Sequence, residues 1–202
     1  MKKIFLILSF LVCGLSAMFA DEFVVSSVGC SNAKTFYDEE ITLKYDDKAN
    51  VFYLFRSDYS RIYWYTLTPE KLKQLRENVK KAQEWAQLAA EKKSSISKEI
   101  PNSTIKVPVT MKRGNDWYTS SYDMTLYFKF ISSFDEKNGL TSLLIAGNAV
   151  SARQNRYCEL EFESVVFINT SLDKFAEAIS EESVNRAIEE QKKKKSEAEM
   201  FN

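Results

Sequence analysis

Serine–lysine pairs and clustered carboxylates are the residues that could do chemistry here, because the chain has no histidine. Without an imidazole there is no Ser-His or Cys-His nucleophile. A neutral lysine can activate a serine in the pattern Ser-x-x-Lys. Four segments match it: Ser31 with Lys34, Ser95 with Lys98, Ser103 with Lys106, and Ser171 with Lys174. Serine and lysine are abundant enough to explain these matches by chance, and no Lys-Thr-Gly or Ser-Asp-Asn motif accompanies them. We therefore predict no Ser-Lys enzyme.

Acidic residues form groups that could act as a catalytic dyad or bind calcium. The groups are residues 38–40, residues 46–47, and the alternating set Glu159, Glu161 and Glu163. Residues 46–47 have the composition of a turn. The alternating acids are interleaved with Cys158, Leu160 and Phe162, a pattern that predicts one solvated and one buried strand face. We therefore predict no catalytic residue, no metal site and no cofactor.

Aromatic residues crowd two predicted strands, at residues 51–56 and 61–66. A period of two places Tyr63 and Tyr65 on the face opposite Ile62 and Trp64. One interpretation is that all these rings pack in the core or in a second layer. The other is that one set is exposed and forms a recognition surface with nearby arginines, because aromatic and arginine residues dominate interface hot spots. The candidate binding residues are Tyr63, Tyr65, Arg56 and Arg61.

The elements that must position these residues begin with four strands, predicted at residues 22–28, 40–45, 51–56 and 61–66. Their short polar connections favour antiparallel neighbours. A helix follows, since Thr68 supplies a cap, Pro69 fits the first helical position and Glu70 suits the positive end of the dipole. Its apolar stripe consists of Leu72, Leu75, Val79, Ala82, Ala86 and Ala89. The helix is expected to end near Lys93 and to pack one face on a sheet.

The second half repeats this plan, with strands predicted at residues 105–111, 122–131, 140–146 and 157–168 and a helix after Ser171. A new capping signal predicts a kink or break near Ser180. The fold class is therefore α+β: antiparallel sheet covered by two long helices. The halves, residues 21–94 and 103–191, read as two ββββα units that arose by duplication or by convergent topology. They form a single domain over residues 21–191, followed by a charged tail at residues 192–202.

Residues 1–20 have the pattern of a secretory signal peptide, with Lys2 and Lys3 before an apolar run. The preferred cleavage point follows Ala20, with Ala17 as the alternative. The mature protein is therefore expected in the periplasm or outside the cell. In that oxidising compartment Cys30 and Cys158 are predicted to form a disulfide, with two separate buried thiols as the alternative.

The balance of charges limits the kinds of partner, because the chain has 28 basic and 28 acidic residues. Such a chain has no large basic field for nucleic acid. The four lysines from Lys192 to Lys195 are a weak signal for contact with an anionic membrane, since acids follow them. The sequence is thus most typical of an exported, non-catalytic protein-interaction or envelope-associated structural module with an unidentified partner. The first alternative is a small-ligand module for carbohydrate or an apolar molecule that uses the aromatic strands. The second is a hydrolase that works without histidine.

Overall fold

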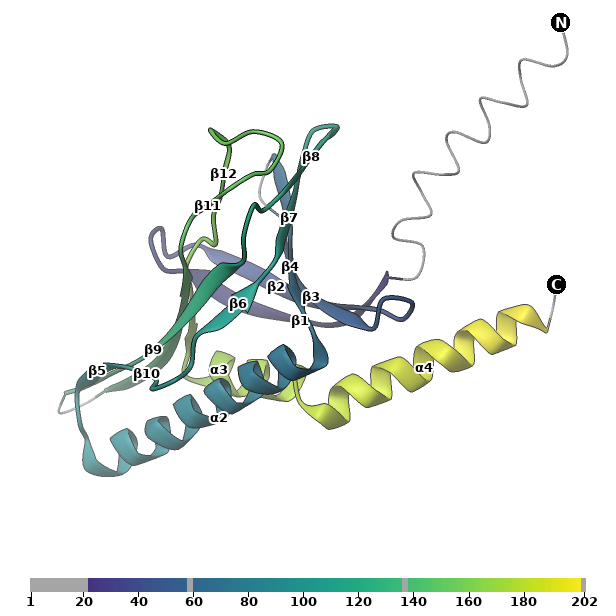
Figure 1. Cartoon of the computed structure of the whole chain (residues 1–202). Coiled ribbons are helices and arrows are strands. Elements are labelled where there is room, and N and C mark those ends of the chain that lie inside the picture. Colours follow the sequence, from purple (N-terminus) through teal and green to yellow (C-terminus); the bar gives the residue numbers. More distant parts are fainter. Residues whose placement is uncertain (1–21, 58–59, 136–137, 201–202) are drawn as a thin grey trace, which may run out of the picture.

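The structure, a computed structural model, describes residues 22–57, 60–135 and 138–200. It has the predicted α+β class, with a large antiparallel sheet and helices on one side of it (Figure 1). The predicted signal peptide of residues 1–20, with both cleavage points, lies outside the described residues.

The first four strands are confirmed and are antiparallel neighbours in chain order. They are β1 (Glu22–Asn32), β2 (Asp38–Asp46), β3 (Val51–Ser57) and β4 (Arg61–Leu67). Alternation sets their faces: in β3, Phe52, Leu54 and Arg56 are buried, whereas Tyr53 and Phe55 on the outer face are only half-buried. The strands therefore direct every second side chain into a common interior.

The described residues after α2 contain nine strands where the sequence predicted four, and the first of the nine, β5, lies before the predicted second half. They are β5 (Ile96–Glu99), β6 (Ile105–Val107), β7 (Val109–Arg113), β8 (Asp116–Thr119), β9 (Met124–Phe134), β10 (Gly139–Gly147), β11 (Val150–Ser151), β12 (Glu159–Leu160) and β13 (Val165–Ile168). Pro108, which has no N–H for a ladder, separates β6 from β7. Because the strand plans of the halves differ, the repeat of two ββββα units is not confirmed.

The bend at Pro108 closes the sheet on itself. On one side of it β6 pairs with β9, and on the other side β7 pairs with β4. From β9 the sheet continues through β10 and β13 to β1, so the strands form a ring. Its weakest junction is between β1 and β13, which pair only at Ser31 and Asn32. We call this junction the seam.

The first predicted helix is confirmed as α2 (Pro69–Lys92). The Thr68 side chain accepts a hydrogen bond from the backbone N–H of Lys71 at 3.3 Å, as expected for an N-cap. The buried face consists of Leu72, Leu75, Val79, Ala82 and Ala89, together with Asn78, and it packs on β9 and β10. Ala86 is only half-buried.

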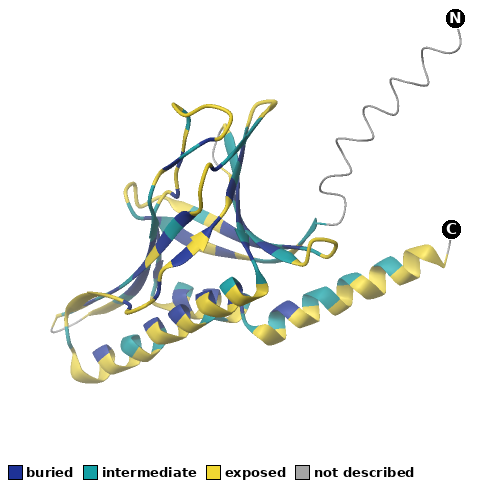
Figure 2. Ribbon diagram, in the orientation of Figure 1, coloured by how far each residue is buried: buried dark blue, intermediate teal, exposed yellow. Residues whose placement is uncertain are grey.

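The second predicted helix is instead two helices, α3 (Thr170–Ala178) and α4 (Glu181–Glu199). The predicted break near Ser180 is confirmed, since the Ser180 hydroxyl accepts from the N–H of Ser183 at 3.1 Å and starts a new helix. Only Val184 of α4 is buried, and the helix projects beyond the sheet (Figure 2). Coverage by two long helices is therefore not confirmed: α2 and the short α3 cover the sheet.

The predicted disulfide is wrong, because Cys30 and Cys158 are both free thiols. Cys30 is buried on β1. Cys158 is held in the loop before β12, where its carbonyl accepts from Ala152 N–H at 2.8 Å and its N–H donates to Asn155 at 2.9 Å. The two cysteines thus belong to separate parts of the fold, and the alternative of two separate buried thiols holds for Cys30, whereas Cys158 is only half-buried.

Candidate functional site

The four candidate binding residues lie together: Arg56, Tyr63 and Tyr65 are buried inside the ring, and Arg61 is half-buried beside them. Arg56 is buried, and its guanidinium donates to the carboxylate of Glu39 and to the backbone carbonyl of Glu163. The Glu163 carboxylate lies 3.9 Å from Arg56 and 3.8 Å from Arg61. Glu163 thus connects the two arginines.

Tyr63 and Tyr65 belong to the same group. They are 6% and 1% exposed, and their rings stack with centroids 5.9 Å apart. The hydroxyl of Tyr65 donates to the carbonyl of Glu161 at 2.8 Å, and burial raises the pKa of that phenol. Tyr65 therefore holds the segment between β12 and β13 from inside, and Tyr63 packs against Tyr65.

A cavity of about 30 Å³ lies beside these side chains. It is lined by Glu39, Arg56, Ser57, Tyr63, Tyr65 and Glu163. One water molecule takes up about 30 Å³ in the liquid, so this space suits a water and not an organic ligand. We call the set Asn32, Glu39, Arg56, Arg61, Tyr63, Tyr65 and Glu163 the arginine cluster.

The arginine cluster braces the hairpin between β1 and β2 through Asn32. The amide of Asn32 donates to Glu39 at 2.7 Å and to Glu163 at 3.4 Å. Its carbonyl oxygen Oδ1 accepts from the backbone N–H groups of Lys34 and Thr35 at 2.9 and 3.0 Å. One buried side chain thus links the interior charges to the turn at residues 33–37.

This turn carries Phe36 and Tyr37, each 76% exposed, which we call the aromatic tip. Its backbone is held on both sides, because Phe36 N–H donates to the carbonyl of Asn32 and Asn32 N–H donates to that of Tyr37, both at 2.9 Å. Phe36 has a φ of 58°. A bulky residue is strained in this left-handed region. The aromatic tip is therefore a fixed and strained projection.

The aromatic residues on the outer face of the strands are less exposed than the aromatic tip. Trp64 is 7% exposed, packs edge-on against Phe55 with centroids 5.4 Å apart, and donates to Glu22 at 3.2 Å. The Lys44 ammonium lies 3.7 Å from the Phe55 ring centroid. These rings form a second packed layer, which leaves the aromatic tip as the more exposed aromatic feature.

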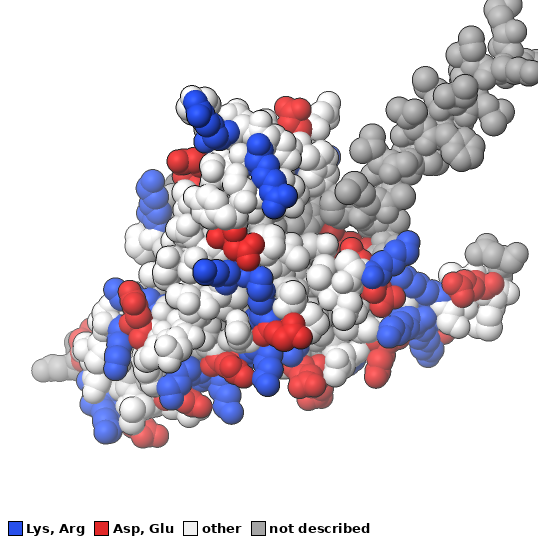
Figure 3. Space-filling model, viewed as in Figure 1, with Lys and Arg blue, Asp and Glu red and all other residues white. Residues whose placement is uncertain are grey.

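Charges of both signs are interleaved over the face seen in Figure 3. Among residues 22–57, 60–135 and 138–200, no group of three or more His, Cys, Asp or Glu residues is arranged to hold a metal ion. No helix within those ranges is long and apolar enough to cross a membrane.

The chain matches no known family. The comparisons found no matching family model, no similar curated protein and no similar solved structure. The site is therefore argued from its geometry alone.

Sequence reasoning named Glu39 only as a member of the acidic group at residues 38–40, and it missed Asn32 and the aromatic tip. One signal was present: residues 33–37 lie between two predicted strands, where turns favour Gly, Pro, Asn, Asp and Ser. Adjacent Phe and Tyr in such a place are unusual. The link from Asn32 to Arg56 had no local signal, because these residues lie on different strands.

Proposed function

We propose that the chain is an exported, non-catalytic protein-interaction module, and that the aromatic tip inserts into an apolar pocket of a partner protein. The observation that carries this proposal is that Phe36 and Tyr37 are each 76% exposed on a turn whose backbone is held by Asn32. Rigid aromatic anchors dominate the energy of many interfaces.

Preorganisation favours such a tip as a binding element. Ordering a flexible loop on binding reduces affinity, whereas hydrogen bonds from Asn32 and the arginine cluster already fix this one. Phe36 occupies a backbone conformation that a glycine would adopt without strain. Strain of this kind is concentrated at functional sites in proteins. The presence of phenylalanine where glycine would be unstrained supports a role in binding for the Phe36 ring.

The neighbouring charges favour a protein over a membrane. Asp38, Glu39 and Glu40 follow the aromatic tip directly; Asp38 and Glu40 are exposed, whereas the Glu39 carboxylate faces Arg56. An acidic run at this position would be repelled by anionic lipid headgroups. An apolar pocket of a protein with basic residues around it would not repel these acidic side chains.

The two alternatives receive less support. A small ligand bound among the aromatic strands would need more space than the cavity of about 30 Å³ beside Tyr63 and Tyr65. Glu39 and Glu163 in the arginine cluster give no support to a hydrolase with a carboxylate dyad, because both carboxylates face Arg56.

Crosslinking in cells, followed by identification of the attached protein, tests the proposal. The double variant Phe36→Ser/Tyr37→Ser is expected to lose the crosslinked partner while melting like the unmodified protein. Loss of one such anchor costs about 2 kcal/mol, or about thirty-fold in affinity. Tyr157→Ser is the matched control, since Tyr157 is 80% exposed in another loop. Retention of the same partner by the double variant would refute the proposal.

A further inference from the structure

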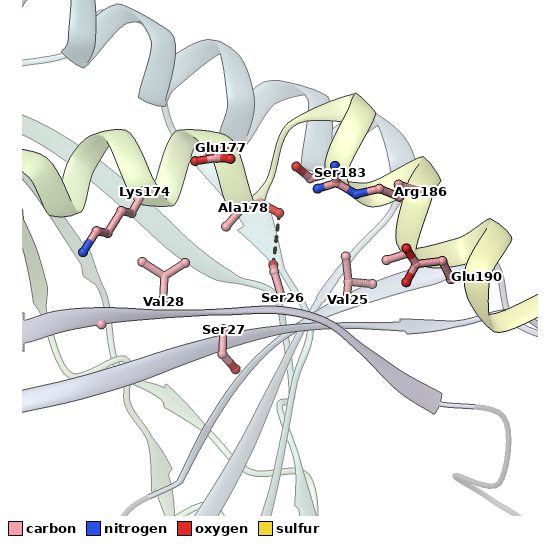
Figure 4. A pocket seen from close by; sticks show the side chains of 12 residues that line it. Val25, Ser26, Ser27, Val28, Lys174, Glu177, Ala178, Ser183, Arg186 and Glu190 are labelled. Atoms are coloured by element: carbon pink, nitrogen blue, oxygen red, sulfur yellow. Dashed lines mark hydrogen bonds between the residues drawn. The ribbon is translucent and has the colours of Figure 1, made fainter.

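A groove of about 550 Å³ separates β1 from the helices α3 and α4 (Figure 4). Residues 25–29 of β1 all line it, one after another. Figure 4 shows Val28 and Ser26 pointing toward the helices and Ser27 pointing the opposite way. Ser27 lines the groove although its side chain points away from the helices and meets Thr42 of β2 at 2.8 Å, so the backbone of the strand itself borders the groove.

This edge of β1 is the one that faces β13, and it continues from the seam toward residue 22. On one side β1 pairs with β2 from Glu22 to Ser31, but β13 joins it on the other side only at Ser31 and Asn32. Within the described residues, no strand covers the second side from residue 22 to residue 29. A strand with one open side presents unpaired N–H and C=O groups that can accept another strand. The helices do not replace those bonds, because the hydrogen bond from Ser26 to the carbonyl of Ala178, at 3.0 Å, comes from a side chain.

Charged side chains border the groove on the helix side. Lys174 and Glu177 come from α3, and Arg186 and Glu190 come from α4, so that the sign alternates along the chain. All four are exposed, and none makes an ion pair with another residue in the described part of the chain. A small anion in this groove would be repelled by two carboxylates. A peptide segment that carries both acidic and basic side chains could place each of them beside a residue of opposite charge.

We propose that the open edge of β1 at residues 25–29, beside the seam, binds an extended peptide segment of a partner protein, which adds to β1 as a further strand. Backbone hydrogen bonds to residues 25–29 would supply affinity along about 17 Å of strand. Acidic side chains of the segment would pair with Lys174 and Arg186, and basic ones with Glu177 and Glu190. This site is separate from the aromatic tip and does not depend on it.

The probe is an array of synthetic eight-residue peptides of Val and Thr that carry two Lys and two Glu in every arrangement, with Ser-substituted neutral peptides beside them. We expect a subset of the charged arrangements to bind more strongly than the neutral peptides. Lys174→Glu/Arg186→Glu is expected to weaken the best peptide at least ten-fold, and the same peptide with its two Glu replaced by Lys should recover the loss. Lys73→Glu/Lys80→Glu, on the exposed face of α2, is the matched control and should change nothing.

Hydrogen exchange with the best peptide bound gives a second readout. Added protection of amides in residues 24–29 is expected. The proposal is overturned if no charged peptide exceeds the neutral ones, if charge reversal leaves binding unchanged, or if binding leaves these amides unprotected. The Phe36→Ser/Tyr37→Ser variant should bind the peptide normally, so failure here and failure of the aromatic tip can be told apart.

Discussion

Arg56 lies at the end of β3 with Glu39 on one side and the Glu163 carbonyl on the other, and all three groups are withdrawn from bulk water to different degrees. A buried arginine in such a place is weak evidence for added stability, because desolvation opposes the charge attraction. Its position argues more strongly for specificity: it connects β2, β3 and the segment before β13, and through Asn32 it holds the turn at residues 33–37.

Removing the buried cation of the arginine cluster should lower the free energy of unfolding. Arg56→Met is expected to lower the free energy of unfolding by about 3 kcal/mol, because Glu39 would keep a partly buried charge without its cation. Arg61→Met should cost no more than about 1 kcal/mol, since its side chain is 34% exposed. Urea denaturation of both variants checks this, and equal losses would contradict the assignment of Arg56 as the central cation.

Strain at Phe36 predicts a substitution that does not lower the free energy of unfolding, in contrast to Arg56→Met. Phe36→Gly should leave stability unchanged or raise it by about 0.5–1 kcal/mol, because glycine adopts a φ of 58° without strain. Phe36→Ala retains the strained backbone and is the matched comparison. If both variants have the same midpoint in thermal unfolding, the turn is not strained as described.

The cysteines should differ in reactivity. Burial raises the pKa of the Cys30 thiol to about 11, so it stays protonated at neutral pH, whereas Cys158 is only half-buried. Iodoacetamide at pH 8 is expected to modify Cys158 about ten-fold faster or more in the folded protein, and at similar rates after unfolding. Because the folded state favours the protonated thiol of Cys30, the associated stability is present below about pH 9 and is lost as the pH rises through 11. Faster labelling of Cys30, measured by mass spectrometry, would contradict this.

At the scale of elements, α2 could be predicted because its signals are local. A hydroxyl cap, a proline at the first position and a stripe at spacings of three and four lie within one segment. The short strand β11 could not, since two residues carry no periodicity, and the strand predicted at residues 157–168 is instead the two short strands β12 and β13. Pro108 was visible in the sequence, but its effect of directing β6 and β7 to different neighbours depends on the closed sheet. The break at Ser180 was local and was predicted.

The face assignment of α2 can be tested directly. Leu75 is fully buried, so Leu75→Ala should cost about 2–5 kcal/mol through lost burial and a residual cavity. Lys73 is exposed on the opposite face, and Lys73→Ala should change stability by no more than about 0.5 kcal/mol. Equal effects in chemical denaturation would show that the helix is docked differently.

For the whole molecule, closure of the sheet determines what the aromatic strands can do. Alternation predicted that Tyr63 and Tyr65 share a face, but only the ring places that face inside, beside Arg56 and Glu163. The same closure leaves the hairpin turn at residues 33–37 at the surface. No local pattern contains these long-range relations, so the sequence named the candidate residues with packing in the core as one of two interpretations, and only the closed sheet shows that Arg56, Tyr63 and Tyr65 are buried.

The proposed role of the aromatic tip is tested most directly by photo-crosslinking from Tyr37. A photoreactive phenylalanine analogue placed there should attach to one discrete partner in cells, and the same group at Tyr157 should not. The Tyr37 crosslink should disappear when Phe36→Ser is added, although the protein still melts as before. Crosslinking from Tyr157 alone, or equal crosslinking from both positions to the same protein, would contradict the assignment of the aromatic tip as the partner-binding element.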